Sequence, residues 1–397
     1  MKSYTLSELL TIKNGRSHHH LNPGTIPVYG SGGLMTCVDE YLYDGPSILL
    51  PRKGSLSNIQ FADGKFWTVD TLYYTIVNTE LADPYYLFCY LSKLDLSRLD
   101  SGTGVPSMTF DSYYQIEVSL PDIAEQRKTA QLLYSYDRAI RHNRQINDNL
   151  EAMAKQLYDY WFVQFDFPDA NARPYKSSGG QMVWNEKLKR EIPSEWQESS
   201  IGEQGVYNTD FTANGSFAGL AENVKYNEGE RYAMLVRIVD FNDDFSDPKK
   251  FVYINKHGYD YLKTCHLHGG EIIICNVGNA GATYRCPNIG LNMALGPNGV
   301  MLNNERLNNY LYLYFCSAIG QHSIKTITSG SIQLKFNKTS LRNLPILIPA
   351  EDVIAQFNDI VNNINKLQNE KWLESRELIG QRNKVLNLMM NGQAVIR

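Results

Sequence analysis

The stretch of sequence that decides the fold occurs twice in the chain. "SGTGVPSMTFDSYYQIEVSLP" spans residues 101–121, and "SGSIQLKFNKTSLRNLPILIP" spans residues 329–349. Both open with Ser-Gly and end in alternating apolar residues and a proline, and the numbering of the second is higher by 329 − 101 = 228. Apolar alternation with a period of two predicts a strand with one buried face. A period this long lies far outside the range of solenoid repeats, so the repeated unit is a whole module.

A second pair of matching stretches lies upstream of the first. "SILLPRKGSLSNI" (residues 47–59) matches "EIIICNVGNAGAT" (residues 271–283), with Gly54 opposite Gly278. The numbering here differs by 278 − 54 = 224, so a short insertion or deletion separates the two matches. Each stretch predicts a short apolar strand followed by a polar loop that contains glycine.

Downstream of each proline the apolar period becomes helical. Positions that step by three and four run from residue 133 to residue 161, and adding 228 gives a second seam from residue 361 to residue 389. Four heptads of seam predict a long helix that packs against another helix. We expect these two helices to pair antiparallel with each other; the alternative is two unrelated amphipathic helices on separate cores. The residues predicted to form the pairing are Leu133, Tyr136, Ile140, Leu150, Leu157, Trp161, Val361, Ile364, Leu378, Val385 and Met389.

The order of these segments predicts an α/β (α+β) fold with a pseudo-twofold internal repeat. Two globular modules are joined by two long antiparallel coiled-coil helices. We place module 1 at residues 1–121, the first spacer helix at 122–165, a linker at 166–196, module 2 at 197–349 and the second spacer helix at 350–397. The linker is rich in Pro, Gly, Ser and Asn, which predicts little internal structure.

The composition is that of a globular protein and limits the choice of partners. The 397 residues suffice for two or three domains, and a net charge of −4 argues against a non-specific coat on nucleic acid. No apolar run approaches the roughly 18 residues of a membrane span, and the start of the chain lacks the pattern of a signal peptide. The six cysteines include no Cys-x-x-Cys. We therefore expect reduced thiols and a cytoplasmic location.

One segment carries a family resemblance. "LPDIAEQRKTAQLLYSYDRAI" (residues 120–140) resembles the conserved-region signature of the specificity subunits of Type I restriction-modification systems. In that family an apolar strand ends in proline and Glu-Gln opens a long helix, here Pro121, Glu125 and Gln126. Residues 161–196 are similar to the family's linker, and the resemblance covers nearly the whole chain.

The second copy departs from this signature. After Pro349 it reads "AEDVIAQFNDIV", with two extra residues and Ala355-Gln356 in place of Glu-Gln. The helical role is intact, but Ala355 stands where the signature has its first-turn glutamate.

The resemblance implies a function in host defence. Each module is then a target-recognition domain that reads one half of an asymmetric bipartite site in double-stranded DNA. The helices set the spacing and recruit two adenine methyltransferase subunits and, through them, the restriction subunits. This chain is then non-catalytic and binds no cofactor, because S-adenosylmethionine and methyl transfer belong to the partner. A helix over residues 124–162 would be about 58 Å long, against about 34–36 Å for one turn of duplex DNA.

Candidate DNA-binding residues lie in the polar, glycine-bearing loops that follow strands. Backbone can approach phosphate closely there, and Asn or Gln suits adenine while Arg or Lys suits guanine. For single residues, an ordinary polar turn is an equally good explanation. The candidates are Arg52, Lys53, Ser55, Ser57, Asn58, Ser101, Thr103 and Ser107 in module 1, and Asn276, Asn279, Arg285, Ser329, Ser331, Gln333 and Lys335 in module 2.

Other motifs allow other functions. "DPYY" (residues 83–86) resembles the catalytic motif of amino-methyltransferases and would make the chain a stand-alone adenine methyltransferase. A helix N-terminus, with Asp as cap and Pro in the first turn, explains the same letters. "HHH" (residues 18–20) and "CHLH" (residues 265–268) match no standard zinc spacing, so we predict no metal site. A scaffold that binds partners through its helices and reads no DNA is the third alternative.

Overall fold

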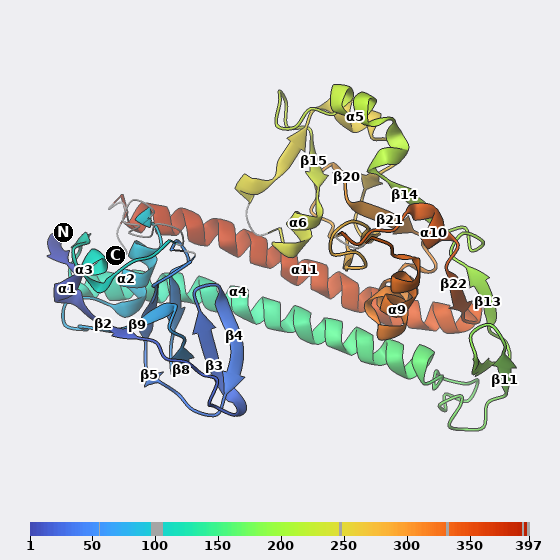
Figure 1. Cartoon of the computed structure of the whole chain (residues 1–397), viewed down its shortest axis with the longest axis horizontal. Coiled ribbons are helices and arrows are strands. Elements are labelled where there is room, and N and C mark those ends of the chain that lie inside the picture. Colours follow the sequence, from blue (N-terminus) through green and yellow to red (C-terminus); the bar gives the residue numbers. More distant parts are fainter. Residues whose placement is uncertain (55, 97–105, 246–247, 331–332, 391–392, 395–397) are drawn as a thin grey trace. The chain divides into compact units, whose positions relative to one another are not determined.

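The structure is a computed structural model that describes residues 1–54, 56–96, 106–245, 248–330, 333–390 and 393–394. It divides into two compact units (Figure 1). Unit 1 comprises Met1–Arg141 and Glu377–Arg397, and unit 2 comprises His142–Arg376. Each unit therefore contains one globular domain and a stretch of each long helix. None of the described helices combines the length and the apolar character that crossing a membrane requires.

Domain 1, the globular part of unit 1, is built from two four-stranded sheets and one further strand pair. The sheet orders are β2-β9-β6-β7 and β4-β3-β8-β5, and β1 pairs with β10. The strands are β1 (Lys2–Thr5), β2 (Leu10–Asn14), β3 (Pro23–Gly30), β4 (Gly33–Val38), β5 (Tyr43–Asp44), β6 (Ser47–Pro51), β7 (Gln60–Ala62), β8 (Lys65–Thr68), β9 (Leu72–Val77) and β10 (Glu117–Leu120). The short helices are α1 (Leu6–Leu9), α2 (Pro84–Leu91) and α3 (Phe110–Tyr114).

Domain 2, the globular part of unit 2, has sheets of orders β14-β21-β18-β19 and β16-β15-β20-β17, with β13 paired to β22. Its strands are β13 (Gln197–Ser200), β14 (Tyr207–Asp210), β15 (Ala233–Val236), β16 (Val252–Ile254), β17 (His266–Leu267), β18 (Ile272–Cys275), β19 (Thr283–Arg285), β20 (Met293–Leu295), β21 (Gly299–Asn303) and β22 (Pro345–Ile348). Its helices are α5 (Phe217–Asn223), α6 (Ile238–Asn242), α7 (Lys256–Tyr261), α8 (Asn308–Cys316), α9 (Ala318–Ile327) and α10 (Lys338–Arg342), with 3-10 turns η3 (Phe211–Asn214) and η4 (Pro248–Lys250).

The two domains share one topology. Replacing β2, β9, β6 and β7 by β14, β21, β18 and β19 converts one sheet order into the other, and the second sheets correspond in the same way. In both domains the second sheet contains a parallel pair, β3 with β8 and β15 with β20. The numbers of the first residues of β10 and β22 again differ by 345 − 117 = 228. The predicted internal repeat and fold class are therefore confirmed.

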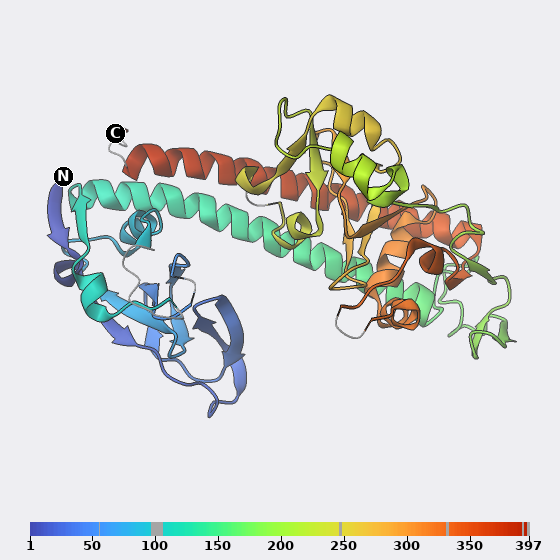
Figure 2. The same cartoon turned by 45° about the horizontal axis from the view of Figure 1, so that its top comes forward.

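The long helices are α4 (Ile123–Tyr158) and α11 (Glu351–Met390), and they run antiparallel (Figure 2). In unit 2, the Asn147 Nδ2 donates to the Gln368 carbonyl (3.1 Å), and the Gln368 Nε2 donates to the Asn147 carbonyl (3.3 Å). In unit 1, Arg382 of α11 forms an ion pair with Asp137 of α4 (3.3 Å). Higher residue numbers on one helix thus meet lower numbers on the other.

The predicted seam residues differ in burial. Leu133, Ile140, Trp161 and Val361 are buried. Leu133 packs in the core of domain 1 together with Leu386 and Met390 of α11, so the seam stabilises the domain as well as the helix pair. The remaining predicted positions are half-buried: Tyr136, Leu150, Leu157, Ile364, Leu378, Val385 and Met389.

Both long helices begin at the same point of the repeat. Helix α4 starts two residues after Pro121, and α11 starts two residues after Pro349, so the second copy contains no insertion. The counterpart of Gln126 is therefore Ile354 and not Gln356, which corrects the alignment of the signature. Gln126 is 1% exposed and Ile354 is 0% exposed.

Gln126 has a defined structural role. Its Nε2 donates to the carbonyls of Leu81 (3.1 Å) and Pro121 (2.9 Å), and its Oε1 accepts from the Asp83 N–H (3.0 Å). It thereby joins the start of α4 to the loop before α2. In the second copy an apolar side chain fills the same place.

Each domain is fixed to the helix pair at equivalent positions. Tyr85 of α2 donates its hydroxyl hydrogen to Asp137 of α4, and the matching residues are 85 + 224 = Asn309 and 137 + 228 = Asn365. The Asn365 Nδ2 donates to the Asn309 Oδ1 at 2.8 Å. A polar contact from the same helix of the domain to the same turn of the spacer is therefore conserved between the copies.

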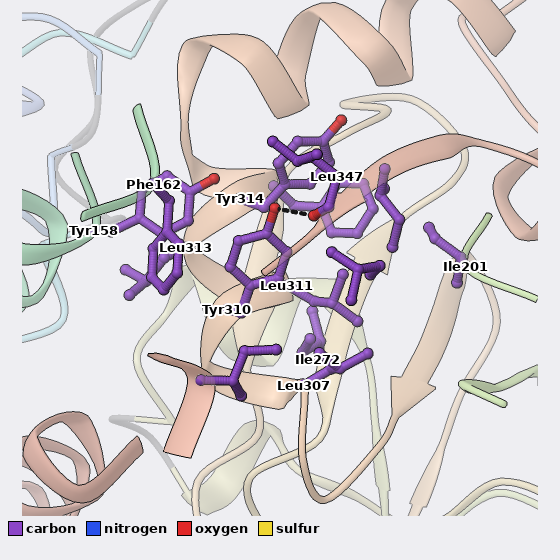
Figure 3. Close-up of a cluster of buried hydrophobic side chains, with 14 of the residues drawn as sticks. Tyr158, Phe162, Ile201, Ile272, Leu307, Tyr310, Leu311, Leu313, Tyr314 and Leu347 are labelled. Atoms are coloured by element: carbon purple, nitrogen blue, oxygen red, sulfur yellow. Dashed lines mark hydrogen bonds between the residues drawn. The ribbon is translucent and has the colours of Figure 1, made fainter. Parts of the chain in front are cut away.

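The main core of unit 2 joins the helix pair to domain 2 (Figure 3). Tyr158, the last residue of α4, contributes its ring to this core. Phe162, in the π-helical turn η2 (Asp159–Val163), contributes a second ring. The Tyr310 hydroxyl of α8 donates to the Leu347 carbonyl of β22 at 2.6 Å. Burial raises the pKa of Tyr310, so this hydroxyl stays protonated.

The linker is more ordered than its composition predicts. Residues 166–196 contain a hairpin of β11 (Met182–Asn185) and β12 (Arg190–Pro193). Phe167 and Trp196 are buried and their rings stack with centroids 5.2 Å apart. The expectation of little internal structure was wrong, because aromatic residues among the turn formers give this segment a core.

Candidate nucleic-acid interface

In domain 1, two predicted loop segments lie against each other. The Gly54 N–H donates to the Pro106 carbonyl (2.9 Å), the Met108 N–H donates to the Arg52 carbonyl (3.0 Å), and Lys53 forms an isolated bridge with Ser107. We call residues 52–54 and 106–108 the paired loop of domain 1. Ser107 is far from Arg52 and Lys53 in the sequence but lies beside them in the fold.

Domain 2 contains the same arrangement. The Gly278 N–H donates to the Leu334 carbonyl (3.0 Å), the Phe336 N–H donates to the Asn276 carbonyl (3.2 Å), and Val277 bridges to Lys335. Residues 276–278 and 334–336 form the paired loop of domain 2. Gly54 and Gly278 have φ angles of 90° and 88°, a conformation that favours glycine.

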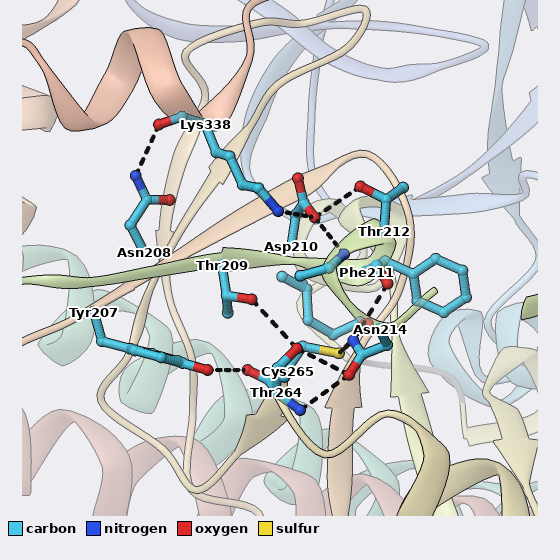
Figure 4. A network of polar contacts seen from close by, with 12 residues as sticks. Tyr207, Asn208, Thr209, Asp210, Phe211, Thr212, Asn214, Thr264, Cys265 and Lys338 are labelled. Carbon is cyan, nitrogen blue, oxygen red and sulfur yellow. Dashed lines mark hydrogen bonds and ion pairs between the residues drawn. The ribbon is translucent and has the colours of Figure 1, made fainter. Parts of the chain in front are cut away.

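Each paired loop continues into a capped helix, which holds it in place. Thr109 accepts from the Ser112 N–H at the start of α3, and Asn337 accepts from the Ser340 N–H at the start of α10. In domain 2 a polar network adds support (Figure 4): the Lys338 Nζ lies 3.1 Å from the Asp210 Oδ1, and the Asn208 Nδ2 donates to the Lys338 carbonyl. Helix α10 is thereby tied to β14 and η3.

Most of the described candidates are accessible. Ser329 pairs with Lys335 through two backbone hydrogen bonds, of 2.8 and 2.9 Å, so it belongs to the same surface as the paired loop of domain 2. The exposed candidates are Lys53, Ser57, Asn279, Ser329, Gln333 and Lys335, and the half-buried ones are Arg52, Asn58, Ser107 and Asn276. The predicted residues Ser55, Ser101, Thr103 and Ser331 lie outside the described residues.

Arg285 has structural contacts that the sequence did not indicate. Its Nη1 donates to the Asn309 Oδ1 (2.9 Å), and its guanidinium lies 4.4 Å from the centre of the Tyr312 ring. Burial lowers the pKa of Arg285. Arg285 therefore packs against α8, toward which β19 directs it, and its contact with DNA stays a prediction.

Asn58 has a structural contact that the sequence did not indicate. Its Nδ2 donates to the Ser31 carbonyl (2.8 Å), and the Gln60 Nε2 donates to the Gly30 carbonyl (2.9 Å). The segment after the paired loop thereby holds the turn between β3 and β4. That turn contains the "GSGG" stretch, which by its letters is only a tight turn.

Sequence analysis also missed an apolar groove beside the paired loop of domain 2. It measures about 680 Å³, and its lining includes Asn276 and Val277 of the loop and the exposed rings of Phe217 and Tyr226. Single exposed aromatic residues give no periodic signal in a sequence, so no pattern could have indicated this groove.

The other motifs have structural explanations. Asp83 caps α2, because its Oδ1 accepts from the N–H groups of Tyr85 (3.0 Å) and Tyr86 (2.9 Å). The His266 ring stacks on Tyr259 with centroids 3.8 Å apart. Across the described part of the chain, no three His, Cys, Asp or Glu residues are grouped as metal ligands would be.

Comparison with known proteins finds a family and several relatives that this chain is similar to. A family described as the Type I restriction modification DNA specificity domain matches residues 1–152. The Type I restriction enzyme HindI specificity subunit of Haemophilus influenzae is 22% identical over 368 residues, which cover 80% of this chain and 78% of that protein. The MjaIX specificity subunit of Methanocaldococcus jannaschii is 28% identical over 120 residues, 30% of this chain and only 26% of that protein.

A solved structure shares the fold. The crystal structure of the S subunit of a Type I restriction-modification system from M. genitalium matches with a TM-score of 0.58 at 15% identity, over 98% of this chain and 95% of that one. Together with the duplicated domains and helix pair, these matches make the chain similar to DNA-specificity proteins. Within that class, residues 1–152 match the Type I restriction modification DNA specificity domain, and most of the chain is similar to specificity subunits of Type I restriction enzymes.

Proposed function

We propose that this chain selects the DNA sequence for a Type I restriction-modification complex, and that each domain reads one half of an asymmetric two-part site. One observation carries this proposal: the two paired loops have the same backbone but different side chains. Lys53 and Ser107 of domain 1 correspond to Val277 and Lys335 of domain 2. Two loops with the same backbone but different hydrogen-bond donors, acceptors and charges can recognise two different sets of base edges.

The charges of the paired loops fit a groove of DNA. Arg52, Lys53 and Lys335 can contact phosphate or guanine, while Gln333 and Asn279 can bond adenine through two hydrogen bonds. The chain as a whole is acidic, so phosphate contacts are local and few. Salt dependence of binding should accordingly be modest.

Helices α4 and α11 offer a surface for partner helices in unit 2. Ile146 and Met153 of α4 and Tyr160 of η2 are exposed at intervals of seven residues, and Ile360 and Leu367 are exposed at the same interval on α11. This set is the apolar stripe. A heptad interval is the spacing at which another helix packs along a seam.

The apolar stripe faces away from domain 2. Glu151 accepts from the Tyr312 hydroxyl of domain 2, and Asn365 bonds Asn309. Met153 and Leu367 follow these residues by two positions, or about 200° around the helix. We assign the stripe to two adenine methyltransferase subunits, through which the restriction subunits join. S-adenosylmethionine and methyl transfer then belong to those partners, and the helices set the spacing of the half-sites.

A methylome tests this function. Cells that carry the neighbouring methyltransferase gene are sequenced for N6-methyladenine with and without the gene for this chain. We expect one asymmetric two-part motif to lose its methylation when this gene is deleted. An unchanged methylome would contradict the proposal, and methylation of DNA by the purified chain alone would favour a stand-alone methyltransferase.

A further inference from the structure

The hairpin of β3 and β4 in domain 1 carries two neighbouring apolar residues that are exposed. Leu34 is 63% and Met35 is 58% exposed. Tyr29 pairs with Leu34 and Val28 pairs with Thr36, so Met35 is the extra residue of a β-bulge. A bulge interrupts the alternation of a strand and redirects side chains, and bulges are frequent next to functional sites. The bulge explains how two consecutive residues both stay outside the core.

This hairpin is continuous with the paired loop of domain 1. The hydrogen bonds from Asn58 to Ser31 and from Gln60 to Gly30 tie the hairpin to the segment that follows the loop. A Cβ added to Gly54 of the paired loop would lie 3.2 Å from the Ser31 Oγ. Hairpin and paired loop therefore form one surface, and a molecule that contacts Lys53 lies within reach of the hairpin.

The tip of the hairpin is open to the approach of a large partner. A Cβ added to Gly32 or Gly33 would meet no atom within 4 Å. Arg16 brings positive charge close to the hairpin. Its N–H donates to the Thr68 carbonyl, and the N–H of the next residue, Val69, donates to the Tyr29 carbonyl of β3. Arg16 is exposed, as is one acidic residue of the same region, Asp70.

We propose that the β3–β4 hairpin enters the major groove of the half-site read by domain 1, and that Leu34 and Met35 contact thymine methyl groups there. The major groove admits a two-stranded ribbon, and the thymine methyl is the apolar group that base edges present in it. Arg16 and Lys53 then face phosphates at the rim. This inference rests on the proposed function and names the base feature that domain 1 reads.

Domain 2 connects the corresponding strands in a different way. Its corresponding strands, β15 and β16, are joined by residues 237–251 instead of a short glycine turn. The β3–β4 hairpin can therefore recognise thymine methyl groups in only one of the two half-sites. That confinement gives the test an internal control.

The test replaces thymine by deoxyuridine, which removes only the methyl group. Binding of the full-length chain, in complex with its methyltransferase subunits, is measured by fluorescence anisotropy on duplexes that carry the motif found in the methylome. Thymines are replaced one at a time in both half-sites. For the wild type we expect replacement in one half-site to weaken binding about fourfold per contacted methyl group. In Leu34→Ala, Met35→Ala and the double variant, that penalty should disappear.

Two further variants complete the design. Leu291→Ala removes an exposed leucine from domain 2 and should keep the full uracil penalty. Gly32→Glu adds a carboxylate to the open tip, without a steric conflict in the free protein, and should weaken binding to every duplex. Uracil substitution without effect in both half-sites, or a penalty that persists in the double variant, would overturn the inference alone. Absence of any sequence-selective binding by the wild type would overturn the proposed function with it.

Discussion

Single side chains distinguish the two paired loops. At the matched positions only Gly54 and Gly278 are identical, and both have φ near 90°. The backbone of the loop therefore depends on one glycine, while its neighbours can vary with the bases to be read. The glycine and the polar loop were evident from the sequence, but the pairing with residues 106–108 and 334–336 depends on tertiary structure.

Lys53 is predicted to contact phosphate. Substitution by Gln removes one cation from the exposed end of the paired loop without disturbing the core. We expect the slope of log affinity against log salt concentration to become shallower by about 0.9, with all sequences weakened alike. Anisotropy titrations between low and moderate salt measure this slope. Lys128→Gln, at an exposed position of α4, is the matched control, and an equal change in both variants would contradict the assignment.

Asp83 separates the structural from the catalytic interpretation of "DPYY". Burial raises the pKa of Asp83, although the N–H groups of Tyr86 and Tyr85 act in the opposite direction. When the pKa of a carboxyl group is higher in the folded state than in the unfolded state, ionisation of the group destabilises the folded state. Stability of the wild type relative to Asp83→Ser should therefore fall as the pH rises from about 3.8, the ordinary value.

Serine is also an N-cap, so Asp83→Ser should keep α2 intact. Urea midpoints between pH 4 and 7 measure the relative stability, and a difference that does not change with pH would contradict the burial of this group. Methylation by the assembled complex should be unaffected by Asp83→Ser. Its loss in a folded variant would restore the methyltransferase alternative.

Other residues show what a sequence pattern cannot indicate. Arg285 stands in a polar stretch after a strand, as a DNA-binding residue would, yet it packs on Tyr312 inside unit 2. Leu34 and Met35 carry no periodic signal, because a bulge is defined by pairing and not by residue type. In both cases the partner strand or helix decides where the side chain points.

Among the elements, the repeat was the strongest signal in the sequence. The offset of 228 read from the letters also relates β10 to β22 and the start of α4 to the start of α11. Matching by letters failed at the helix start, where Gln126 and Gln356 look alike but Ile354 occupies the equivalent place. It also failed in the linker, where Phe167 and Trp196 pack in spite of the surrounding turn formers.

Gln126 in the first copy and Ile354 in the second occupy equivalent positions, and this difference predicts how substitutions there affect stability. Gln126→Leu leaves the Asp83 N–H and the half-buried carbonyls of Leu81 and Pro121 without the Gln126 side chain as partner, and should destabilise domain 1 by about 3 kcal/mol. Ile354→Gln buries an amide among apolar residues and should destabilise unit 2 by about 2 kcal/mol. Hydrogen exchange, resolved by segment, measures each effect in its own unit.

Gln131→Leu, at an exposed position of α4, is the control for Gln126→Leu. Unchanged exchange around α2 in Gln126→Leu would show that the three hydrogen bonds contribute little. The segment-resolved method is needed because a chain with two units need not unfold in one step.

At the scale of the whole molecule, each unit takes its helical support from both long helices. Domain 1 packs on the start of α4 and the end of α11, and domain 2 packs on the end of α4 and the start of α11. Two similar readers on one pair of helices can divide a recognition site between them. The central claim is therefore that the two half-sites are read independently.

The most direct test is the methylome of cells that carry variants of the candidate DNA-binding residues of one domain at a time. Arg52→Ala with Lys53→Ala alters domain 1, and Gln333→Ala with Lys335→Ala alters domain 2. We predict that each pair of substitutions relaxes or abolishes recognition in one half of the methylated motif and leaves the base preferences of the other half unchanged. A variant pair that alters both halves together, or two pairs that alter the same half, would contradict the account.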